Sequence, residues 1–427
     1  MKIRTNDLRL ISRASLAAFG TYFCMYAFRK PFAVATFDDL ELWGIDYKIV
    51  LIIAQVLGYM LSKCIGVKII SELKTSQRLT YLLGLISVAE ISLICFATTP
   101  TPYNCIFMFF NGLPLGMIWG IVFSYLEGRK FTEIMGVLLC TSFIVSSGVV
   151  KSIGLFTMAT WGVSQFWMPA VTGALFILPL LFFAYLLETI PAPTEEDKEL
   201  RVERLPMNKR ERRSVIKRFL MPLTLLIAFY TALTAFRDLR DNYARELWDS
   251  LGYVGDISVY SSSEIFVAIL VLIILGTVYA VKDNLKALLT YHGILLIGTL
   301  SLGLATFLLQ AQLLSPFLWM VITGFGLYIC YVPFNALFFD RFIAAFRING
   351  NAGFLIYLAD AFGYLGSMTV LLYKNFGMSQ ISWLRFFING AYGLAVFGSI
   401  IVIISYFQLK KKHHSMHFKP ISHEQKI

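Results

Sequence analysis

Two adjacent cations interrupt the first apolar stretch of the chain. Arg29 and Lys30 are the charged residues of residues 19–37, which are otherwise aromatic, aliphatic or small. A charge within a membrane span costs several kcal/mol, so such residues are usually kept for a pathway or a binding site. Arginine offers a planar fork that fits two oxygens of a carboxylate or phosphate, and lysine adds a mobile point charge. The pair therefore indicates recognition of an anion.

A short echo places another arginine at the corresponding point of the second half of the chain. Residues 27–30 (AFRK) recur as residues 235–238 (AFRD). Transporters built from two repeats place corresponding residues around a central site. Arg29 and Arg237 would then face each other at mid-membrane and clamp one anion. The alternative for Arg237 is a position near the outer membrane surface, paired with Asp241 one helical turn further on.

A few other polar residues of the apolar stretches are candidates for the same site. Lys151 follows two serines and a glycine, an environment that favours a cavity over lipid. Lys63 lies near the end of its stretch, where extension to the lipid headgroups is an equal alternative. Tyr22 and Tyr26 share a helical face with Arg29, although tyrosines also serve in ordinary packing. The candidate proton-coupling carboxylates are Asp360, Asp340 and Glu264.

Composition shows what must position these residues. The chain of 427 residues is 57% hydrophobic and 15% charged, with a mean hydropathy of +0.69, which is outside the soluble globular range. Apolar runs of about 18 residues or more recur along its length, so we predict an all-α integral membrane protein with twelve spans. The predicted spans are residues 12–37, 47–67, 79–98, 103–126, 134–158, 165–187, 219–244, 257–281, 285–309, 315–339, 350–373 and 381–408.

The spans fall into two groups of six. We predict an N-terminal six-helix half at 1–187, a cytoplasmic linker at 188–218, a C-terminal six-helix half at 219–408 and a cytoplasmic tail at 409–427. Within the fourth span, Gly112, Gly116 and Gly120 recur at four-residue spacing, which predicts close approach of another helix. Gly363 and Gly366 predict the same for the eleventh span.

The charge distribution sets the expected orientation. Nearly all lysines and arginines of the connections lie in alternate connections, beginning with the N-terminus, and the other side holds only Lys48, Arg245, Lys374 and Arg385. The positive-inside rule then places both termini in the cytoplasm of a cell membrane, inner or plasma. The net charge of +11 is explained by this topology and gives no support to nucleic-acid binding.

Signatures of other protein classes are missing from the sequence. It contains no P-loop, ABC signature, nucleophile elbow or HExxH motif, so we expect no enzyme and no ATP-driven pump. The six cysteines form no CxxC pair, and the histidines of the C-terminal segment fit a disordered basic tail better than a metal site. We therefore expect no cofactor and no metal, and a monomer in the lipid bilayer.

Several short motifs are distributed over the two halves of the chain. They are Tyr22…Tyr26…Arg29-Lys30, Ser62-Lys63, Arg237, residues 331–333 (YVP), and residues 352–354 (AGF) with 362–367 (FGYLGS). Together they resemble the motifs of the organophosphate:phosphate antiporters, a branch of the major facilitator superfamily. The resemblance implies the twelve-helix major-facilitator fold of two six-helix halves, rocker-switch alternating access, and exchange of a phosphorylated small molecule for inorganic phosphate.

The sequence departs from that family at four places. Pro31 replaces an asparagine, Ser142 stands where a site histidine is expected, and residues 71–73 (SEL) replace a DR pair. An additional helical turn with Asp360 separates the AGF and FGYLG segments. The substrate and the exchange mode therefore stay open, and Lys151 is a candidate for the missing site charge.

Three functions fit these observations. The first is a transporter of a small anionic solute, such as a phosphate ester exchanged for phosphate. The second is a proton-coupled carrier of another solute that uses the carboxylates named above. The third is a non-transporting membrane sensor that signals through the linker or tail.

Overall fold

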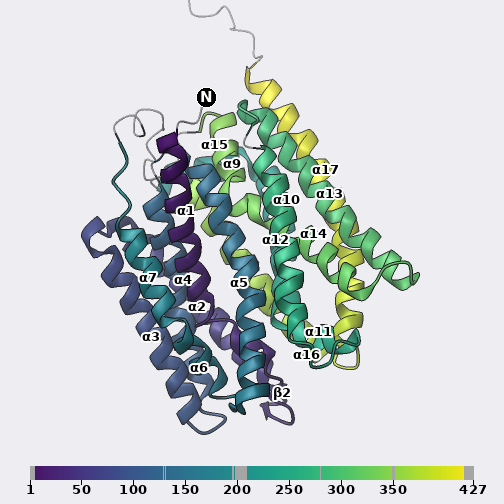
Figure 1. Cartoon of the computed structure of the whole chain (residues 1–427). Helices are drawn as coiled ribbons and strands as arrows, with labels where there is room; N and C mark the ends of the chain where they lie inside the picture. The colour runs from purple at the N-terminus through teal and green to yellow at the C-terminus, as the bar shows by residue number, and fades with distance from the viewer. Residues whose placement is uncertain are drawn as a thin grey trace, which may run out of the picture.

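The computed structural model describes residues 5–127, 129, 131–194, 197, 209–278, 280–348 and 352–417. Long helices run roughly side by side through these residues (Figure 1). A short antiparallel ladder joins β1 (Glu41–Leu42) to β2 (Ile45–Asp46), with Glu41 opposite Asp46 and Leu42 opposite Ile45.

The helical elements before residue 195 are α1 (Thr5–Tyr26), η1 (Pro31–Val34), α2 (Tyr47–Glu72), η2 (Thr75–Gln77), α3 (Arg78–Thr98), α4 (Cys105–Leu126), α5 (Thr132–Trp161), α6 (Met168–Leu175) and α7 (Ile177–Glu188). Those after residue 208 are α9 (Lys209–Arg218), α10 (Leu220–Asn242), α11 (Ala244–Ser250), α12 (Ser258–Val278), α13 (Asn284–Gln310), α14 (Pro316–Ala336), α15 (Phe338–Ala345), α16 (Ala352–Gly377) and α17 (Trp383–His417). Apart from the ladder, the secondary structure of the described residues is helical.

Ten helices of the described chain are long and apolar enough to cross a membrane. The pair α6 and α7, bent by 44°, adds an eleventh if it counts as one span. The bend follows from Pro179 in the first turn of α7, which has no amide hydrogen to bond back into α6. Helix α1 stands where the first span was predicted and does not meet the same criterion; its first turns carry Asp7, Arg9 and Arg13.

The prediction of one continuous first span over 12–37 is wrong. Helix α1 ends at Tyr26, residues 27–30 form turns, and the short 3₁₀ helix η1 begins at Pro31. Pro31 has no amide hydrogen, so a continuous helix across it would lose a backbone hydrogen bond. Arg29 and Lys30 therefore lie in the turn between α1 and η1.

Two side chains from neighbouring spans complete the broken end of α1. Asn111 of α4 donates from Nδ2 to the carbonyl of Phe28 at 2.9 Å, and Gln55 of α2 donates from Nε2 to the carbonyl of Arg29 at 3.0 Å. The two amides also bond each other at 2.8 Å. An unpaired carbonyl in hydrocarbon is costly, so these amides permit non-helical backbone at this depth.

Close helix contacts occur where glycine spacing predicted them. A Cβ added at Gly112 of α4 would lie 2.1 Å from the Gln55 carbonyl oxygen of α2, and one at Gly116 would lie 2.6 Å from the Cβ of Ser62. In the second half, a Cβ at Gly366 of α16 would lie 2.5 Å from the Thr231 side chain of α10. Both predictions of small-residue packing are confirmed.

The helices before residue 195 contact those after 208 along several pairs. Helix α5 packs against α12 and α14, α2 packs against α16, and η1 contacts α10 and α11. Figure 1 shows the start of α1, α9 and the end of α17 on one side of the molecule, and α11 and β2 on the opposite side.

The last helix is longer than predicted. Helix α17 has 35 residues, or about 52 Å at 1.5 Å per residue, against a hydrocarbon thickness of about 30 Å. It therefore extends beyond the predicted span 381–408. The prediction of a disordered tail is wrong for residues 409–417, which are helical, and residues 418–427 lie outside the described residues.

Candidate functional site

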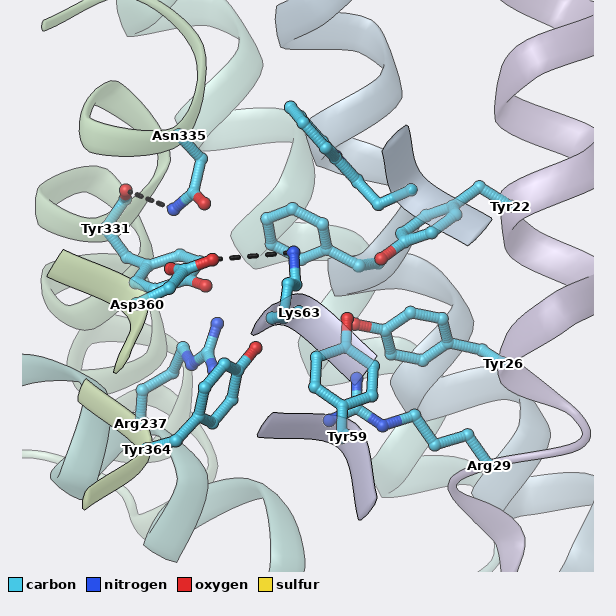
Figure 2. A pocket seen from close by; sticks show the side chains of 12 residues that line it. Tyr22, Tyr26, Arg29, Tyr59, Lys63, Arg237, Tyr331, Asn335, Asp360 and Tyr364 are labelled. Carbon is cyan, nitrogen blue, oxygen red and sulfur yellow. Dashed lines mark hydrogen bonds and ion pairs between the residues drawn. The ribbon is translucent and has the colours of Figure 1, made fainter. Parts of the chain in front are cut away.

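A polar cavity lies between the two sets of helices. Its lining is Tyr22, Tyr26 and Arg29 from α1 and the turn after it, Tyr59 and Lys63 of α2, Trp119 of α4, Phe143 of α5, Arg237 of α10, Tyr331 and Asn335 of α14, and Asp360 and Tyr364 of α16. The space bounded by this lining, together with the part that is open to solvent, is about 370 Å³. Arg29 and Tyr26 enter it from one side and Arg237 and Asp360 from the other (Figure 2). The two arginines linked by the sequence echo thus share one cavity.

Arg29 is a buried cation without a carboxylate partner among the described residues. Its side chain is 9% exposed, and its guanidinium carbon lies 3.9 Å from the ring centroid of Tyr59 and 5.9 Å from that of Tyr26. Its Nε is buried and has no hydrogen-bond partner in the described chain. The aromatic faces stabilise the cation in part and leave its donors available to a ligand.

Arg237 is held by contacts of a different kind. Its guanidinium carbon lies 3.8 Å from the ring centroid of Tyr331, and its Nη2 donates to Oδ1 of Asp238 at 2.5 Å. The other oxygen of Asp238 accepts from Ser367 at 2.8 Å. The alternative pairing of Arg237 with Asp241 is therefore wrong. Arg237 lies within a helix, whereas Arg29 follows the end of one. The two matching tetrapeptides therefore differ in backbone conformation.

Lys63 points into the cavity and does not extend to the headgroups. Its Nζ lies 3.4 Å from Oδ2 of Asp360 and within 6 Å of the ring centroids of Tyr59, Trp119 and Tyr357. The ion pair joins α2 to α16 across the cavity. Asp360 is 3% exposed.

Lys30 and Lys151 do not line this cavity. Both bind Asp241 at a separate buried cluster, in which each lysine contacts a different carboxylate oxygen. Lys30 also donates to Oδ1 of Asn242 at 2.9 Å, Lys151 donates to the Asp241 carbonyl at 2.6 Å, and Ser147 donates to the same carboxylate. The prediction that both lysines share a site with Arg29 is therefore wrong in geometry. The carboxylate that pairs with both lysines, Asp241, lies outside the cavity. The turn after α1 directs the adjacent side chains of Arg29 and Lys30 to different sites.

The other two candidate carboxylates are also outside the cavity. Glu264 of α12 accepts from Arg240 at 2.6 Å and lines a smaller space of about 230 Å³ together with Lys151 and Asp241. Asp340 lies on α15 and is not among the cavity residues. Ser142 is buried and donates to the carbonyl of Leu139 at 2.6 Å. Of the three carboxylates, Asp360 alone lines the cavity.

Several cavity residues were not predicted as site residues. Tyr59 lies four residues before Lys63, and Tyr364 lies four residues after Asp360, so each shares a helical face with its charged neighbour. That spacing was a usable signal. Trp119 and Phe143 carried none, because an aromatic residue in an apolar span is usually a packing residue.

Solved structures with a similar fold are membrane transporters. A D-xylose–proton symporter matches with a TM-score of 0.59 and 16% identity, over 93% of this chain and 96% of that chain. A bacterial homologue of the human drug peptide transporters PepT1 and PepT2 matches at 0.62 and 12%, over 95% and 99%. A mutant of the nucleoside transporter NupG matches at 0.59 and 14%, over 94% and 99%. At these identities the likeness shows the fold alone: the chain is a multi-pass membrane protein with the major-facilitator fold.

A sequence-family model identifies the family of the chain. The model of DUF5690, a family of unknown function, matches residues 31–412, and the chain belongs to that family. No curated protein matches the chain.

Proposed function

We propose that the protein is a secondary transporter that carries a small anionic solute across a membrane by alternating access. The observation that carries this proposal is Arg29, a buried cation with no carboxylate partner in the described chain, which shares a cavity with Arg237. A buried charge without a partner is strongly destabilising, by about 3–5 kcal/mol. A ligand anion that contacts both guanidinium groups would supply the partner.

The charge balance of the cavity favours an anion. Three cations line it, Arg29, Lys63 and Arg237, against the carboxylate of Asp360, and Asp238 pairs with Arg237, so these five groups together carry one positive charge. A phosphate ester carries a charge of about −1.5 to −2 at neutral pH and offers three acceptor oxygens. In its most specific form, the proposal is therefore exchange of a phosphate ester for inorganic phosphate.

The similar structures support transport as the activity. Those proteins carry a sugar, peptides and a nucleoside, all of them small solutes. The proposal includes a cell membrane in which both termini face the cytoplasm, because the start of α1 and the end of α17 lie on the same side and the basic connections follow the positive-inside rule. It also includes the division into two six-helix halves at the boundaries given above, and a monomer.

Counterflow in proteoliposomes tests the proposal. Vesicles are loaded with unlabelled phosphate, and labelled phosphate, glycerol 3-phosphate, glucose 6-phosphate or lactate is added outside in separate assays. Labelled phosphate and at least one phosphate ester should accumulate transiently, and labelled lactate should accumulate little because it lacks a phosphoryl group with three acceptor oxygens. If the purified protein neither binds nor exchanges any of these anions, the proposal is wrong.

A further inference from the structure

We propose that Asp360 is an internal competitor of the transported anion for Lys63, and that it takes up a proton when the anion displaces it. Each anion that crosses would then carry one proton with it. This inference rests on the proposed function, because it assigns the energy coupling of the same cavity. It concerns one ion pair, Lys63–Asp360, which joins α2 to α16.

The distance between nitrogen and oxygen is longer in the Lys63–Asp360 pair than in the other ion pairs that join the two sets of helices in the described chain. Its 3.4 Å separation exceeds the roughly 2.7–2.9 Å of a charge-assisted hydrogen bond. By contrast, the charged atoms of Lys48 and Glu246 are 2.5 Å apart, and those of Arg341 and Glu133 are 2.9 Å apart. Lys30 and Lys151 are both in direct contact with the carboxylate of Asp241. Lys63 is therefore the cation that an incoming anion can most easily draw away.

The two oxygens of Asp360 have different partners. Tyr230 of α10 donates to Oδ1 at 2.6 Å, and Asn335 of α14 donates to the Tyr230 hydroxyl at 3.2 Å. Oδ2 faces Lys63. Loss of Lys63 thus leaves Oδ1 hydrogen-bonded and Oδ2 without a cation, and Oδ2 is the atom that receives the proton.

No other cation is placed to replace Lys63 within the described chain. The titratable or charged groups that face the cavity around Asp360 are Lys63 and Tyr59 of α2, Tyr230 and Arg237 of α10, Tyr331 of α14, Tyr357 and Tyr364 of α16, Arg29 after α1, and Tyr22 and Tyr26 of α1. Arg237 is already paired with Asp238, and Arg29 lies over the Tyr59 ring. Asp360 therefore depends on Lys63 for its charge balance.

The exchange of partners balances in charge and protons. In the empty protein, protonated Lys63 pairs with ionised Asp360. In the loaded protein, Lys63 pairs with the anion, and the carboxylate, now buried without a cation, binds a proton from the water on the side from which the anion entered. A buried carboxylate without a partner costs several kcal/mol, so neutralisation is the favoured outcome. Release of the anion on the other side lets Lys63 return and the proton leave.

The proposal separates two modes of transport. Exchange of one phosphate for another moves a proton in each direction, so it does not respond to a pH gradient. Net uptake carries protons inward, so an acidic exterior drives it. With the membrane potential clamped at zero, one coupled proton sustains a concentration ratio of about tenfold per pH unit.

The experiment compares wild type with Asp360→Asn in proteoliposomes, with labelled inorganic phosphate as the probe. Asparagine keeps the side-chain size and an acceptor for Tyr230 but cannot ionise. Both proteins are assayed for phosphate counterflow at equal pH and for net uptake with the exterior one pH unit more acidic. Because phosphate itself titrates, with a second ionisation near pH ~6 for its esters, only the difference between the two proteins at the same pH values is interpreted.

We expect Asp360→Asn to retain counterflow and to lose the additional accumulation driven by the pH gradient. Its phosphate affinity at pH 8 should rise about tenfold over wild type, because the competitor for Lys63 is gone. Asp340→Asn, which alters a carboxylate outside the cavity, should respond to the gradient as wild type does.

Two outcomes would overturn the inference while leaving anion transport in place. One is gradient-driven accumulation by Asp360→Asn equal to that of wild type, and the other is counterflow by wild type without any response to the gradient. If Asp360→Asn does not fold, the double variant Lys63→Gln/Asp360→Asn removes both charges and leaves neither buried alone. It should exchange phosphate with lower affinity and ignore the gradient, and a wild-type response would count against the inference. Absence of counterflow in wild type with every anion would instead contradict the proposed function.

Discussion

Arg29 and Lys30 are adjacent in sequence but belong to regions with opposite charge balance. Arg29 faces the cavity and has no carboxylate partner in the described chain. Lys30 is buried at the cluster around Asp241, where a carboxylate, the Asn242 amide and a second lysine complete one another's contacts. We assign a structural role to the cluster, whose charges are paired, and the proposed ligand-binding role to the cavity, where Arg29 lacks a carboxylate partner in the described chain. The first should therefore govern stability and the second should govern binding.

The cluster belongs to a wider set of contacts between the two sets of helices. Near it, Lys48 of α2 pairs with Glu246 of α11 at 2.5 Å, and Arg245 donates to the Val34 carbonyl of η1 at 2.7 Å. Each contact joins an element before residue 195 to one after residue 208. The proposed alternating access would require such contacts to break and re-form, so their strength would set how readily the two sets of helices separate there.

Removal of the shared carboxylate should have the largest effect on stability. Asp241→Ala leaves Lys30 and Lys151 buried and unpaired, which should cost about 3–5 kcal/mol. Thermal unfolding in detergent should show a clearly lower midpoint. Asp249→Ala, which removes a partly exposed carboxylate paired with Arg245 of the same helix, should change the midpoint little. Equal midpoints for Asp241→Ala and wild type would contradict a structural role for the cluster.

Loss of either guanidinium should mainly affect binding. Arg29→Lys and Arg237→Lys keep the charge but not the bidentate fork, so phosphate affinity should fall by at least about tenfold. The unfolding midpoint in the absence of ligand should change far less than in Asp241→Ala. Equilibrium binding of labelled phosphate measures the effect, with the exposed Arg385→Lys as the control. A variant that binds as wild type does would remove that arginine from the clamp.

The ring beneath Arg29 should contribute less than the guanidinium itself. Tyr59→Leu removes the aromatic face that lies 3.9 Å from the guanidinium carbon, and a desolvated cation–π contact is worth about 1–2 kcal/mol. Tyr59→Phe keeps the ring. Phosphate affinity should therefore fall several-fold in the leucine variant and much less in the phenylalanine variant. Equal losses in both would assign the effect to the hydroxyl group.

The smallest effect should come from one hydroxyl at the cluster. Ser147→Ala removes a hydrogen bond to Asp241 and should lower stability by about 1 kcal/mol. Its neighbour Ser146 is a matched control, because its buried hydroxyl has no hydrogen-bond partner in the described chain. Ser146→Ala should leave the unfolding midpoint unchanged or raise it. A lower unfolding midpoint for Ser146→Ala than for Ser147→Ala would show that the hydrogen bond of Ser147 does not stabilise the cluster.

The sequence allowed prediction of features that depend on local pattern. The apolar windows predicted most of the long helices, and glycine spacing predicted the close contacts of α4 and α16, because backbone approach needs only a small residue on the right face. The recurrence of an arginine in a matching tetrapeptide singled out two residues that share the cavity.

Features that depend on distant partners could not be predicted in this way. The end of α1 at Tyr26 relies on Gln55 and Asn111, which lie on other helices and bond the freed carbonyls. The direction of Lys151 relies on Asp241, 90 residues further along the chain. Hydropathy shows that such residues are buried, but it does not show which buried partner they meet.

A structure with a bound anion tests the shared cavity most directly. Crystals grown with tungstate, a heavy analogue of phosphate, would show the anion by its anomalous signal. We predict one strong peak between the guanidinium groups of Arg29 and Arg237, with oxygens in hydrogen-bonding distance of both. A tungstate bound elsewhere, or an occupied cavity in which either arginine points away from the anion, would contradict the two-armed clamp.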